Sequence, residues 1–342
     1  MESFQKIRIK TPGRLHFGLI DLNGGLGRVD GGIGVAVAEP NIVVSAEFGE
    51  KLEVAGTDRA DEIINAVNKI KNYVDNELNI NTFNGNININ VEHQVPAHSG
   101  LGSTTQLRLA AAKAVFELNK ITIPAREMSK VVGRGGTSGI GTEVFERGGF
   151  ILDGGHSFGA GKQKESFLPS SVSNASPAPV LVRYDIPKDW YFVLVIPDVK
   201  SKIYGQREIN IFHKYGPIPS EDVEKLSRLI LMKILPAVVE RDVESFGSGL
   251  AGMQEVGFKK IEVSLQNKIV VELIGILNKV SFGSGMSSFG PTVYALACGR
   301  KHADEVANEA REFLTYLAGD SVKFEVIITT ADNCGACIER FC

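Results

Sequence analysis

Residues 133–149 read GRGGTSGIGTEVFERGG and hold seven glycines but neither lysine nor aspartate. So dense a run of glycine constrains the fold, because backbone amides there can come very close to another group, most often a phosphate. Enzymes that transfer phosphoryl groups usually place a lysine or a carboxylate beside such a loop. The segment therefore predicts an anion site and leaves open which residues perform the chemistry.

A second glycine-rich segment, VPAHSGLGSTTQLRLAAAKAV, opens an alanine-rich helical pattern. Glycines followed by Ser or Thr leave free N–H groups at the positive end of the helix dipole. A plain helix cap is the alternative, but a cap needs only one Ser or Thr. We therefore favour anion binding at this helix start, by Gly100, Gly102, Ser103, Thr104 and Thr105.

A third segment, TPGRLHFGLIDLNGGLGRVDGG, follows the alternating first strand KIRIK and gathers five charged or titratable side chains within 17 residues, namely Arg14, His16, Asp21, Arg28 and Asp30. Such side chains on a glycine-rich turn can converge on a pocket, although a solvated hairpin with incidental charges gives the same pattern. A fourth segment, SFGSGMSSFGPTVYAL, combines small polar residues with a strand, and a tight loop between core elements would explain it equally well.

Composition narrows the class of protein. The chain has 342 residues, 43% of them hydrophobic and 23% charged, which suits a globular protein of two lobes. A net charge of −3 gives no basis for binding nucleic acid or an anionic membrane. No apolar run reaches the roughly 20 residues of a membrane span, and the polar N-terminus is unlike a signal peptide. We expect a cytoplasmic α+β protein with a Ser- and Pro-rich connection at 166–179.

The four cysteines are Cys298, Cys334, Cys337 and Cys342, and the tail contains one CxxC. A zinc site would need a fourth ligand, and a redox pair would normally open a helix of a thioredoxin-like unit. Neither context is present in the sequence, so we expect a structural or incidental role for these thiols.

The order of the motifs resembles the GHMP kinase superfamily along most of the chain. PGR follows the first strand, GLGS opens a helix, SGIG precedes GG, and a loop of small residues precedes VYAL. The resemblance implies a ribosomal-protein-S5-like N-terminal domain over residues 1–170 and a ferredoxin-like C-terminal domain over residues 171–342. It also implies phosphate bound at the GLGS helix start between the lobes, and a homodimer.

Several residues depart from the kinase pattern. Gly141 stands where several of these kinases carry a catalytic aspartate, and GMSSFGPT puts side chains into a loop that is nearly all glycine in the kinases. GxxxxGK[ST] and a strand-borne GxGxxG are also missing. A site of this kind is poorly built to phosphorylate an alcohol.

The residues that differ from the kinase pattern match one narrower family within this superfamily. GRLHFGLIDLNG, GRVDGGIGVA, GLGSTTQL, GRGGTSGIG, FERGGFILDGGH and GMSSFGPTVYA are similar to the β-ribofuranosylaminobenzene 5′-phosphate synthases, also called β-ribofuranosylphenol 5′-phosphate synthases. The resemblance implies that phosphoribosyl diphosphate is joined to 4-hydroxybenzoate or 4-aminobenzoate with release of CO2 and diphosphate. That reaction is the first committed step toward the arylamine part of methanopterin, and it implies Mg²⁺ as cofactor. The ring is then the nucleophile, so no alcohol needs a base.

The resemblance also suggests roles for residues. Asp21 would hold Mg²⁺ on the diphosphate or stabilise the ribosyl carbon, and Arg28 would grip a phosphate or the aromatic carboxylate. His16 and Arg14 are expected as their neighbours. The remaining contacts are expected from Arg134, Gly135 and Gly136 at the 5′-phosphate and from Ser287 and Ser288 across the cleft.

Two other functions stay open on the sequence. The chain could be a GHMP-type small-molecule kinase that uses ATP and Mg²⁺, although Gly141 in place of the base argues against it. It could instead be a catalytically silent protein that binds a phosphorylated metabolite, although the charged cluster of the third segment exceeds what binding needs.

Overall fold

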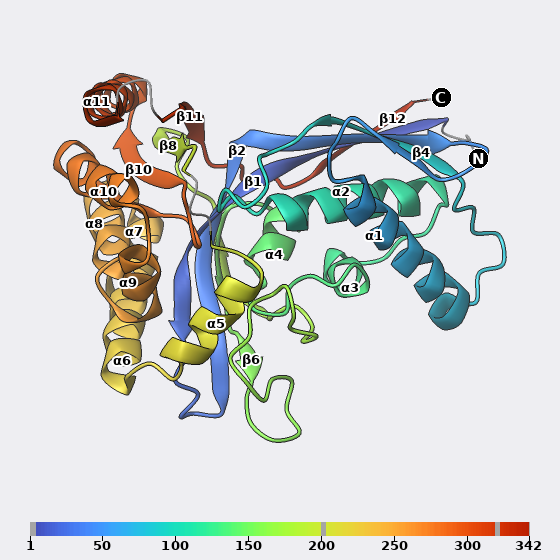
Figure 1. Ribbon diagram of the computed structural model, residues 1–342, viewed down its shortest axis with the longest axis horizontal. Coiled ribbons are helices and arrows are strands. Elements are labelled where there is room, and N and C mark those ends of the chain that lie inside the picture. Colours follow the sequence, from blue (N-terminus) through green and yellow to red (C-terminus); the bar gives the residue numbers. More distant parts are fainter. Residues whose placement is uncertain (1–4, 200–202, 319–321, 342) are drawn as a thin grey trace.

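The computed structural model describes residues 5–199, 203–318 and 322–341. Helices pack around two sheets, one of eight strands and one of four (Figure 1). This arrangement confirms the predicted α+β fold with two lobes.

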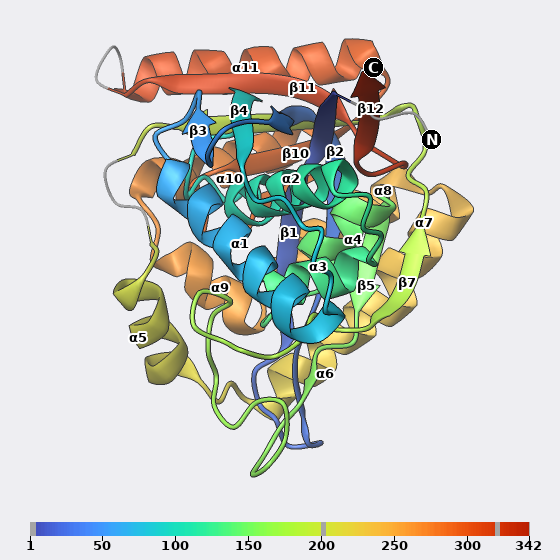
Figure 2. The ribbon, with the colours of Figure 1, turned by 90° about the vertical axis from the view of Figure 1, so that its right-hand side faces the viewer.

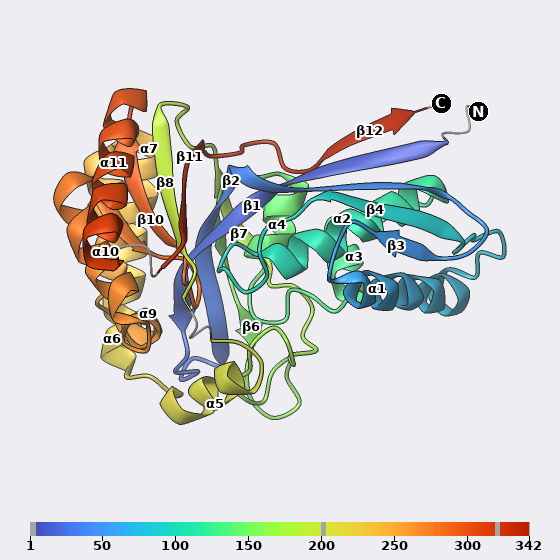
Figure 3. The ribbon, with the colours of Figure 1, turned by 45° about the horizontal axis from the view of Figure 1, so that its top comes forward.

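The larger sheet is built around the long hairpin of β1 (Lys6–Asp21) and β2 (Arg28–Phe48). Figure 3 shows both strands running from the side of the chain termini down to the region beside α5 (Gln206–Tyr215). Their register shifts between Thr11 and Gly13 and again between His16 and Gly18. Because a bulge re-aims the side chains beside it, the second shift sets the direction of His16.

The other strands of this sheet come from distant parts of the chain. They are β3 (Glu53–Ala55), β4 (Ile87–His93), β5 (Phe150–Asp153), β6 (His156–Ser157), β7 (Val180–Tyr184) and β12 (Cys337–Phe341). The two late strands, β7 and β12, pair with β5 and β1. The expected domain division at residue 170 stays a prediction, but sheet membership does not follow it, because the chain adds β7 before it leaves this sheet and returns to it with β12.

Helices of the first lobe lie against one face of the larger sheet (Figure 1). They are α1 (Ala60–Tyr73) with its π-helical extension η1 (Val74–Leu78), α2 (Ser103–Leu118), α3 (Ala125–Val131) and α4 (Ile140–Glu146). In α2 the small side chains Ala110, Ala111 and Ala112 are fully buried. Small side chains let this helix approach the strands closely, which fixes the place of its N-terminus.

The second sheet is antiparallel, in the order β11 (Phe324–Thr330), β8 (Trp190–Pro197), β10 (Val293–Cys298), β9 (Gly283–Met286). Its faces follow strict alternation: Val193 and Val195 pack toward α10 (Lys268–Val280) and α11 (Arg300–Ala318), whereas Phe192 and Leu194 join the main core. Figure 2 shows α11 lying along β11. The remaining helical segments are α6 (Ser220–Leu229), η2 (Ile230–Ile234), α7 (Leu235–Glu240), α8 (Val243–Met253) and α9 (Gly257–Ser264).

Two further expectations concern the cysteines and membrane-spanning segments. Cys334 and Cys337 are exposed free thiols, and Cys342 lies outside the described residues. Within the described ranges, none of the helices combines the length and the apolar character needed to cross a membrane.

Candidate active site

The start of α2 presents unused backbone donors. Gly102 precedes the helix with a φ of +75°, and no side chain of the described residues caps it. The first amide bonded back into the helix is that of Gln106, which donates to the Gly102 carbonyl at 3.1 Å. The first turn therefore has the free amides that the sequence predicted, and anion binding there stays a prediction.

Two arginines stand beside this helix start. Arg134 Nε donates to Thr105 Oγ1 at 3.0 Å. Arg14 Nε is buried and has no hydrogen-bond partner among the described residues. Burial lowers the pKa of each guanidinium to about 10, and Arg134 adds to this effect at Arg14. Both side chains stay charged at neutral pH, so the structure holds two desolvated cations where an anion would be stabilised.

A third arginine, which the sequence did not suggest, supports the same turn. Arg59 is buried, and its Nη2 donates to Thr104 Oγ1 at 2.8 Å. The same guanidinium pairs with Glu62, so its charge is partly compensated. The role of Arg59 is therefore to position Thr104, not to bind a ligand by itself.

We call the cavity at the helix start the outer cavity. It measures about 540 Å³, including the part open to solvent. Its walls come from β1, the segment before α2, the glycine-rich loop and the segment around Tyr204, through Arg14, His98, Gly100, Gly102, Ser103, Thr104, Thr105, Arg134, Ile203, Tyr204, Glu208, Ser288, Phe289 and Gly290.

A second cavity, the inner cavity, adjoins the first and measures about 590 Å³ with its open part. Leu19, Phe212 and Phe289 give it apolar walls. Its other lining residues are Arg14, His16, Thr105, Arg134, Gly135, Thr137, Ser138, Gly141, Pro169, Ser170, Glu208, Glu262 and Ser288. Since Arg14, Glu208 and Phe289 line both cavities, the two form one cleft with a basic end and an apolar-walled end.

His16 contributes a neutral ring to the inner cavity. It is 7% exposed, and burial lowers its pKa well below the ordinary value of 6.5, with Arg14 and Lys259 adding to the effect. Its backbone amide donates to Ser287 Oγ at 3.0 Å, and its carbonyl accepts from the Ser288 amide at 2.8 Å. The histidine is thereby fixed to the loop that precedes β10.

The serines of that loop have different roles. Ser287 is fully buried, and its hydroxyl donates to the Gly100 carbonyl at 2.6 Å. The structure therefore corrects the expected ligand contact of Ser287, because its hydroxyl is consumed in joining the second lobe to the loop before α2. Ser288 lines both cavities, as expected.

Two glutamates face the cleft. Glu262 on α9 forms an ion pair with Lys259, which also donates to the Ser288 carbonyl at 2.9 Å. Glu208 on α5 has no hydrogen bond or ion pair among the described residues. Burial and the neighbouring Glu262 raise the pKa of Glu208, Arg134 opposes the rise, and the net value is about 7.

The glycines of residues 133–149 divide between the cleft and the packing. Gly135 and Gly141 line the inner cavity. A Cβ on Gly136 would lie 2.6 Å from the Ser173 carbonyl oxygen, so this glycine packs against the following loop and not the cavity, contrary to expectation. A Cβ on Gly141 would lie 3.0 Å from Thr105 Cγ2. Gly141 stands at the position where several GHMP kinases carry the catalytic aspartate. This position therefore lies in the cleft wall, where Gly141 contributes backbone alone.

Asp21 and Arg28 lie elsewhere, which corrects the expectation that they join His16 and Arg14. Asp21 Oδ1 accepts from the amides of Asn23 and Gly24, at 2.7 and 2.9 Å. Arg28 donates to the carbonyls of Gly154 and Gly155. Leu19 lines the inner cavity, whereas Ile20 and Asp21, the last residues of β1, line a separate cavity, and the turn after β1 holds the Asp21 carboxylate there.

This separate cavity, the apolar cavity, measures about 950 Å³ with its open part. Asp21, Arg28, Asp30 and Asp153 are its only charged residues among those described. Its apolar lining is Ile20, Leu26, Val29, Leu152, Leu181, Ile230, Leu231 and Leu235.

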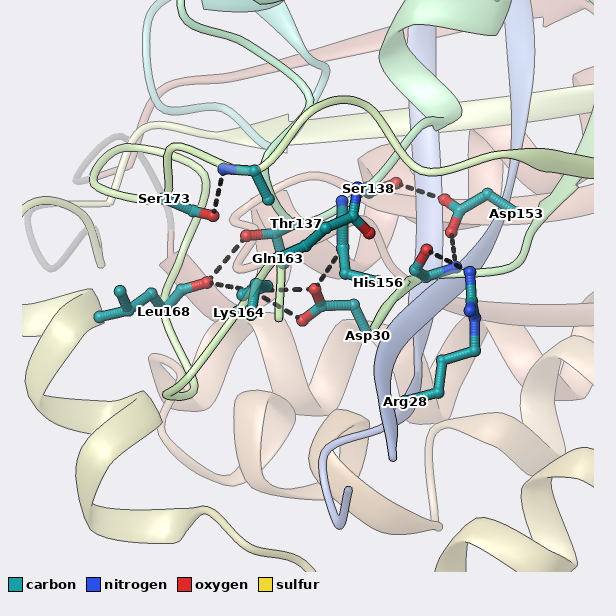
Figure 4. A network of polar contacts seen from close by, with 12 residues as sticks. Arg28, Asp30, Thr137, Ser138, Asp153, His156, Gln163, Lys164, Leu168 and Ser173 are labelled. Atoms are coloured by element: carbon teal, nitrogen blue, oxygen red, sulfur yellow. Dashed lines mark hydrogen bonds and ion pairs between the residues drawn. The ribbon is translucent and has the colours of Figure 1, made fainter. Parts of the chain in front are cut away.

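A buried polar network lies behind the inner cavity (Figure 4). Asp30, held at a φ of +66°, accepts from Lys164 Nζ at 2.8 and 3.0 Å and is bonded to His156 Nδ1 at 2.6 Å. Lys164 also donates to the Leu168 carbonyl at 2.9 Å, as does Thr137 Oγ1 at 2.8 Å. The network thus fixes the backbone just before two residues of the cavity wall, Pro169 and Ser170.

The described residues do not build a metal site of their own. No group of three or more His, Cys, Asp or Glu within them could hold a metal ion. Asp21, the expected ligand, has one oxygen engaged by two amides. Mg²⁺ usually keeps several waters and is bound through one or two carboxylates together with substrate phosphates, so the expected Mg²⁺ stays a prediction.

Some residues of the cleft carried no local signal in the sequence. Glu208, Phe212, Lys259 and Glu262 lie in amphipathic helices where charged and apolar residues alternate in the ordinary way. Only the packing of α5 and α9 against the first lobe turns these side chains toward the glycine-rich loops.

Comparison with known proteins places the chain in a family. The sequence patterns of the GHMP kinases N terminal domain and of the GHMP kinases C terminal domain match residues 63–145 and 234–315. A protein of Methanocaldococcus jannaschii named β-ribofuranosylphenol 5′-phosphate synthase is 45% identical over 96% of this chain and 98% of its own length. Its namesake from Methanothermobacter thermautotrophicus is 42% identical over 96% of this chain and 97% of its own length.

Solved structures agree on the fold. Homoserine kinase from Cytophaga hutchinsonii superimposes with a TM-score of 0.66 at 16% identity, over 99% of each chain. The mevalonate kinase of Methanococcus jannaschii gives a TM-score of 0.60 at 14% identity, over 95% of this chain and 98% of the kinase. At this identity the likeness concerns the architecture alone.

Proposed function

The chain belongs to the family of the β-ribofuranosylphenol 5′-phosphate synthases, and we propose that it joins phosphoribosyl diphosphate to 4-hydroxybenzoate or 4-aminobenzoate with release of CO2 and diphosphate. It is then a decarboxylating pentosyltransferase at the first committed step of methanopterin arylamine synthesis. The observation that carries the proposal is the single cleft in which a basic helix start adjoins an apolar-walled cavity.

The outer cavity is the place for the diphosphate. Free amides at the start of α2, together with Arg14 and Arg134, offer donors and positive charge to its oxygens. The same groups stabilise the charge that grows on the diphosphate as its bond to the ribosyl carbon breaks. Each factor of ten in rate needs about 1.4 kcal/mol of such stabilisation.

The inner cavity is the place for the aromatic acid. Leu19, Phe212 and Phe289 can hold a ring between them, and Phe289 also reaches the outer cavity. The ring carbon that bears the carboxylate must face the ribosyl carbon where the two cavities meet. Holding both reactants in that orientation can supply roughly 7–11 kcal/mol of the barrier.

The chemistry balances without a further reactant. The ring supplies the electron pair for the new C–C bond while the C–O bond to diphosphate breaks. The bond to the carboxyl group then breaks, CO2 leaves, and its electron pair restores the aromatic ring. The para OH or NH2 group provides the electron density for the first step.

Three further features belong to the proposal. Mg²⁺ enters as the complex with phosphoribosyl diphosphate. The protein works in the cytoplasm and as a homodimer, and the exposed leucines around the apolar cavity, Leu26, Leu181 and Leu231, offer an apolar surface for the second copy. Sedimentation of the wild type and of Leu181→Lys tests this, and a wild type that sediments as a monomer contradicts it.

The catalytic roles of Asp21 and Arg28 stay predictions. Neither side chain lines the cleft, so both would have to act from the apolar cavity or after a movement of the hairpin. Turnover near the wild-type value in both Asp21→Asn and Arg28→Ala would contradict these roles.

The function is tested by incubating the protein and Mg²⁺ with phosphoribosyl diphosphate and carboxyl-labelled 4-hydroxybenzoate or 4-aminobenzoate. Labelled CO2 released only when both substrates are present is the expected result. A second tube holds ATP and a panel of small alcohols. If the first tube releases no CO2 and the second produces ADP, the protein is a kinase and not a synthase.

A further inference from the structure

The two acceptors place different demands on the protein, a point that deepens the proposed function and rests on it. When the ring attacks, the para oxygen of 4-hydroxybenzoate becomes a carbonyl oxygen, and its proton has to leave. The para nitrogen of 4-aminobenzoate becomes an iminium nitrogen, which can keep both protons. A phenolic acceptor therefore needs a proton acceptor in the inner cavity, and an arylamine does not.

Three titratable side chains that line the inner cavity could take that proton. His16 is nearly inaccessible, and burial lowers its pKa, which makes it a weak base. Glu262 is 4% exposed and already forms an ion pair with Lys259. Glu208 lines both cavities and has neither a hydrogen bond nor an ion pair among the described residues.

Glu208 reaches the cleft from a different element than the position of the kinase base. It lies in the first turn of α5, which also carries Phe212, whereas Gly141 lies in the first turn of α4. Phe212 follows Glu208 by four residues, so helix geometry puts the carboxylate and the apolar ring wall on one face. A ring held against Phe212 thus has a carboxylate within the same cavity.

We propose that Glu208 takes the hydroxyl proton of 4-hydroxybenzoate during attack and returns it to the product oxygen after CO2 leaves, and that 4-aminobenzoate reacts without it. The proton transfer to Glu208 accompanies formation of the C–C bond, and the carboxylic acid then reprotonates the phenolate. No proton is gained or lost overall.

The charges around Glu208 agree with this role. Burial and Glu262 raise its pKa to about 7, so the carboxylate is available at neutral pH and is a stronger base than an exposed glutamate. Arg134 opposes the rise and keeps the ionised form accessible. The other charged or titratable groups that face the two cavities are Arg14, His16, His98, Tyr204 and Glu262, with Lys259 behind them.

The test compares the wild type with Glu208→Gln on both acceptors at saturating phosphoribosyl diphosphate. We expect kcat/KM for 4-hydroxybenzoate to fall about 100-fold or more, as for loss of a general base. We expect kcat/KM for 4-aminobenzoate to stay within about threefold of the wild type, since no proton has to be removed. Glu221→Gln on the exposed start of α6 is the matched control and should change neither value.

Two measurements separate proton transfer from a change of shape. A ring-fluorinated 4-hydroxybenzoate, already ionised at neutral pH, should recover most of the activity lost in Glu208→Gln. In the wild type, kcat/KM for 4-hydroxybenzoate should fall as the pH drops below about 7, and this limb should be missing in the variant.

Two results would overturn the inference while leaving the synthase in place. One is an equal loss on both acceptors in Glu208→Gln, and the other is a defect that the fluorinated acceptor does not relieve. A wild type that releases CO2 from neither acceptor would instead refute the proposed function and the role of Glu208 with it.

Discussion

Replacing Lys164 by Met tests whether the network behind the inner cavity holds its wall. In the wild type Lys164 Nζ lies 2.8 Å from Asp30 Oδ2 and 2.9 Å from the Leu168 carbonyl. The side chains of Lys164 and Asp30 are 2% and 0% exposed. The substitution keeps most of the volume but leaves a buried carboxylate without its cation.

The expected loss of stability follows from that burial. Removing one partner of a buried ion pair lowers the free energy of unfolding by about 3–5 kcal/mol, because the remaining charge stays desolvated. In a chain of this size the thermal midpoint falls by about 2 °C per kcal/mol, so a fall of about 6–10 °C is expected. The Michaelis constant for the aromatic acid should rise as well, since Pro169 and Ser170 lose their fixed position.

Urea unfolding followed by circular dichroism, together with the CO2-release assay, measures both effects. Lys162→Met changes an exposed lysine of the same loop and is the matched control, with no expected change in either quantity. Adding Asp30→Asn to Lys164→Met removes the orphaned charge, and Asn tolerates the positive φ of that position. The double variant should recover about 1–2 kcal/mol.

The reasoning is refuted if Lys164→Met is as stable as Lys162→Met. It is also refuted if the double variant is no more stable than Lys164→Met, because the cost would then not arise from an unpaired buried charge.

Other substitutions test the cleft. Arg134→Met should raise the Michaelis constant for phosphoribosyl diphosphate about 10- to 100-fold, as for loss of a charge-assisted hydrogen bond, whereas the exposed Arg126→Met should not. Gly141→Ala brings a Cβ to 3.0 Å from a threonine methyl of the helix start and should lower turnover, and Gly141→Asp should lower it without creating ATP-dependent kinase activity. His16 has a depressed pKa in the folded state, so wild-type stability should be complete above pH 6.5 and fall below it. His16→Gln should flatten that fall and exposed His213→Gln should not; a parallel pH dependence in the wild type and His16→Gln would contradict the assignment.

Much of the secondary structure was predictable because periodicity is a local property. The apolar spacing from Ala60 to Leu78 became α1 and η1, and the alternation in NININVEH became β4. The separate strand patterns VAVA and NIVVSAE instead form one strand, β2, which pairs with β1 on both sides of the register shift between Thr11 and Gly13.

The candidate site also has parts that the local sequence predicted and parts that it misplaced. The predicted anion site at residues 102–105 needed no tertiary information, since free amides and the dipole belong to any helix start of this kind. Asp21 and Arg28 were misplaced because proximity in sequence does not say which partners fix a side chain at the end of a strand, and here backbone groups of the turn and of residues 154 and 155 hold both away from the cleft.

By itself the sequence determined the family, the α+β fold and the uncapped helix start of α2, since each depends on motifs or on spacing within one element. Only the tertiary structure decided that Glu208 from α5 and Phe289 from the loop before β10 meet in the cleft. It also decided that the Ser287 hydroxyl bonds the Gly100 carbonyl and so links the two lobes. The ion pair of Lys164 with Asp30, 134 residues apart in the sequence, was decided in the same way. These contacts join elements far apart in the chain, and burial and charge pairing select them, so no local pattern records them.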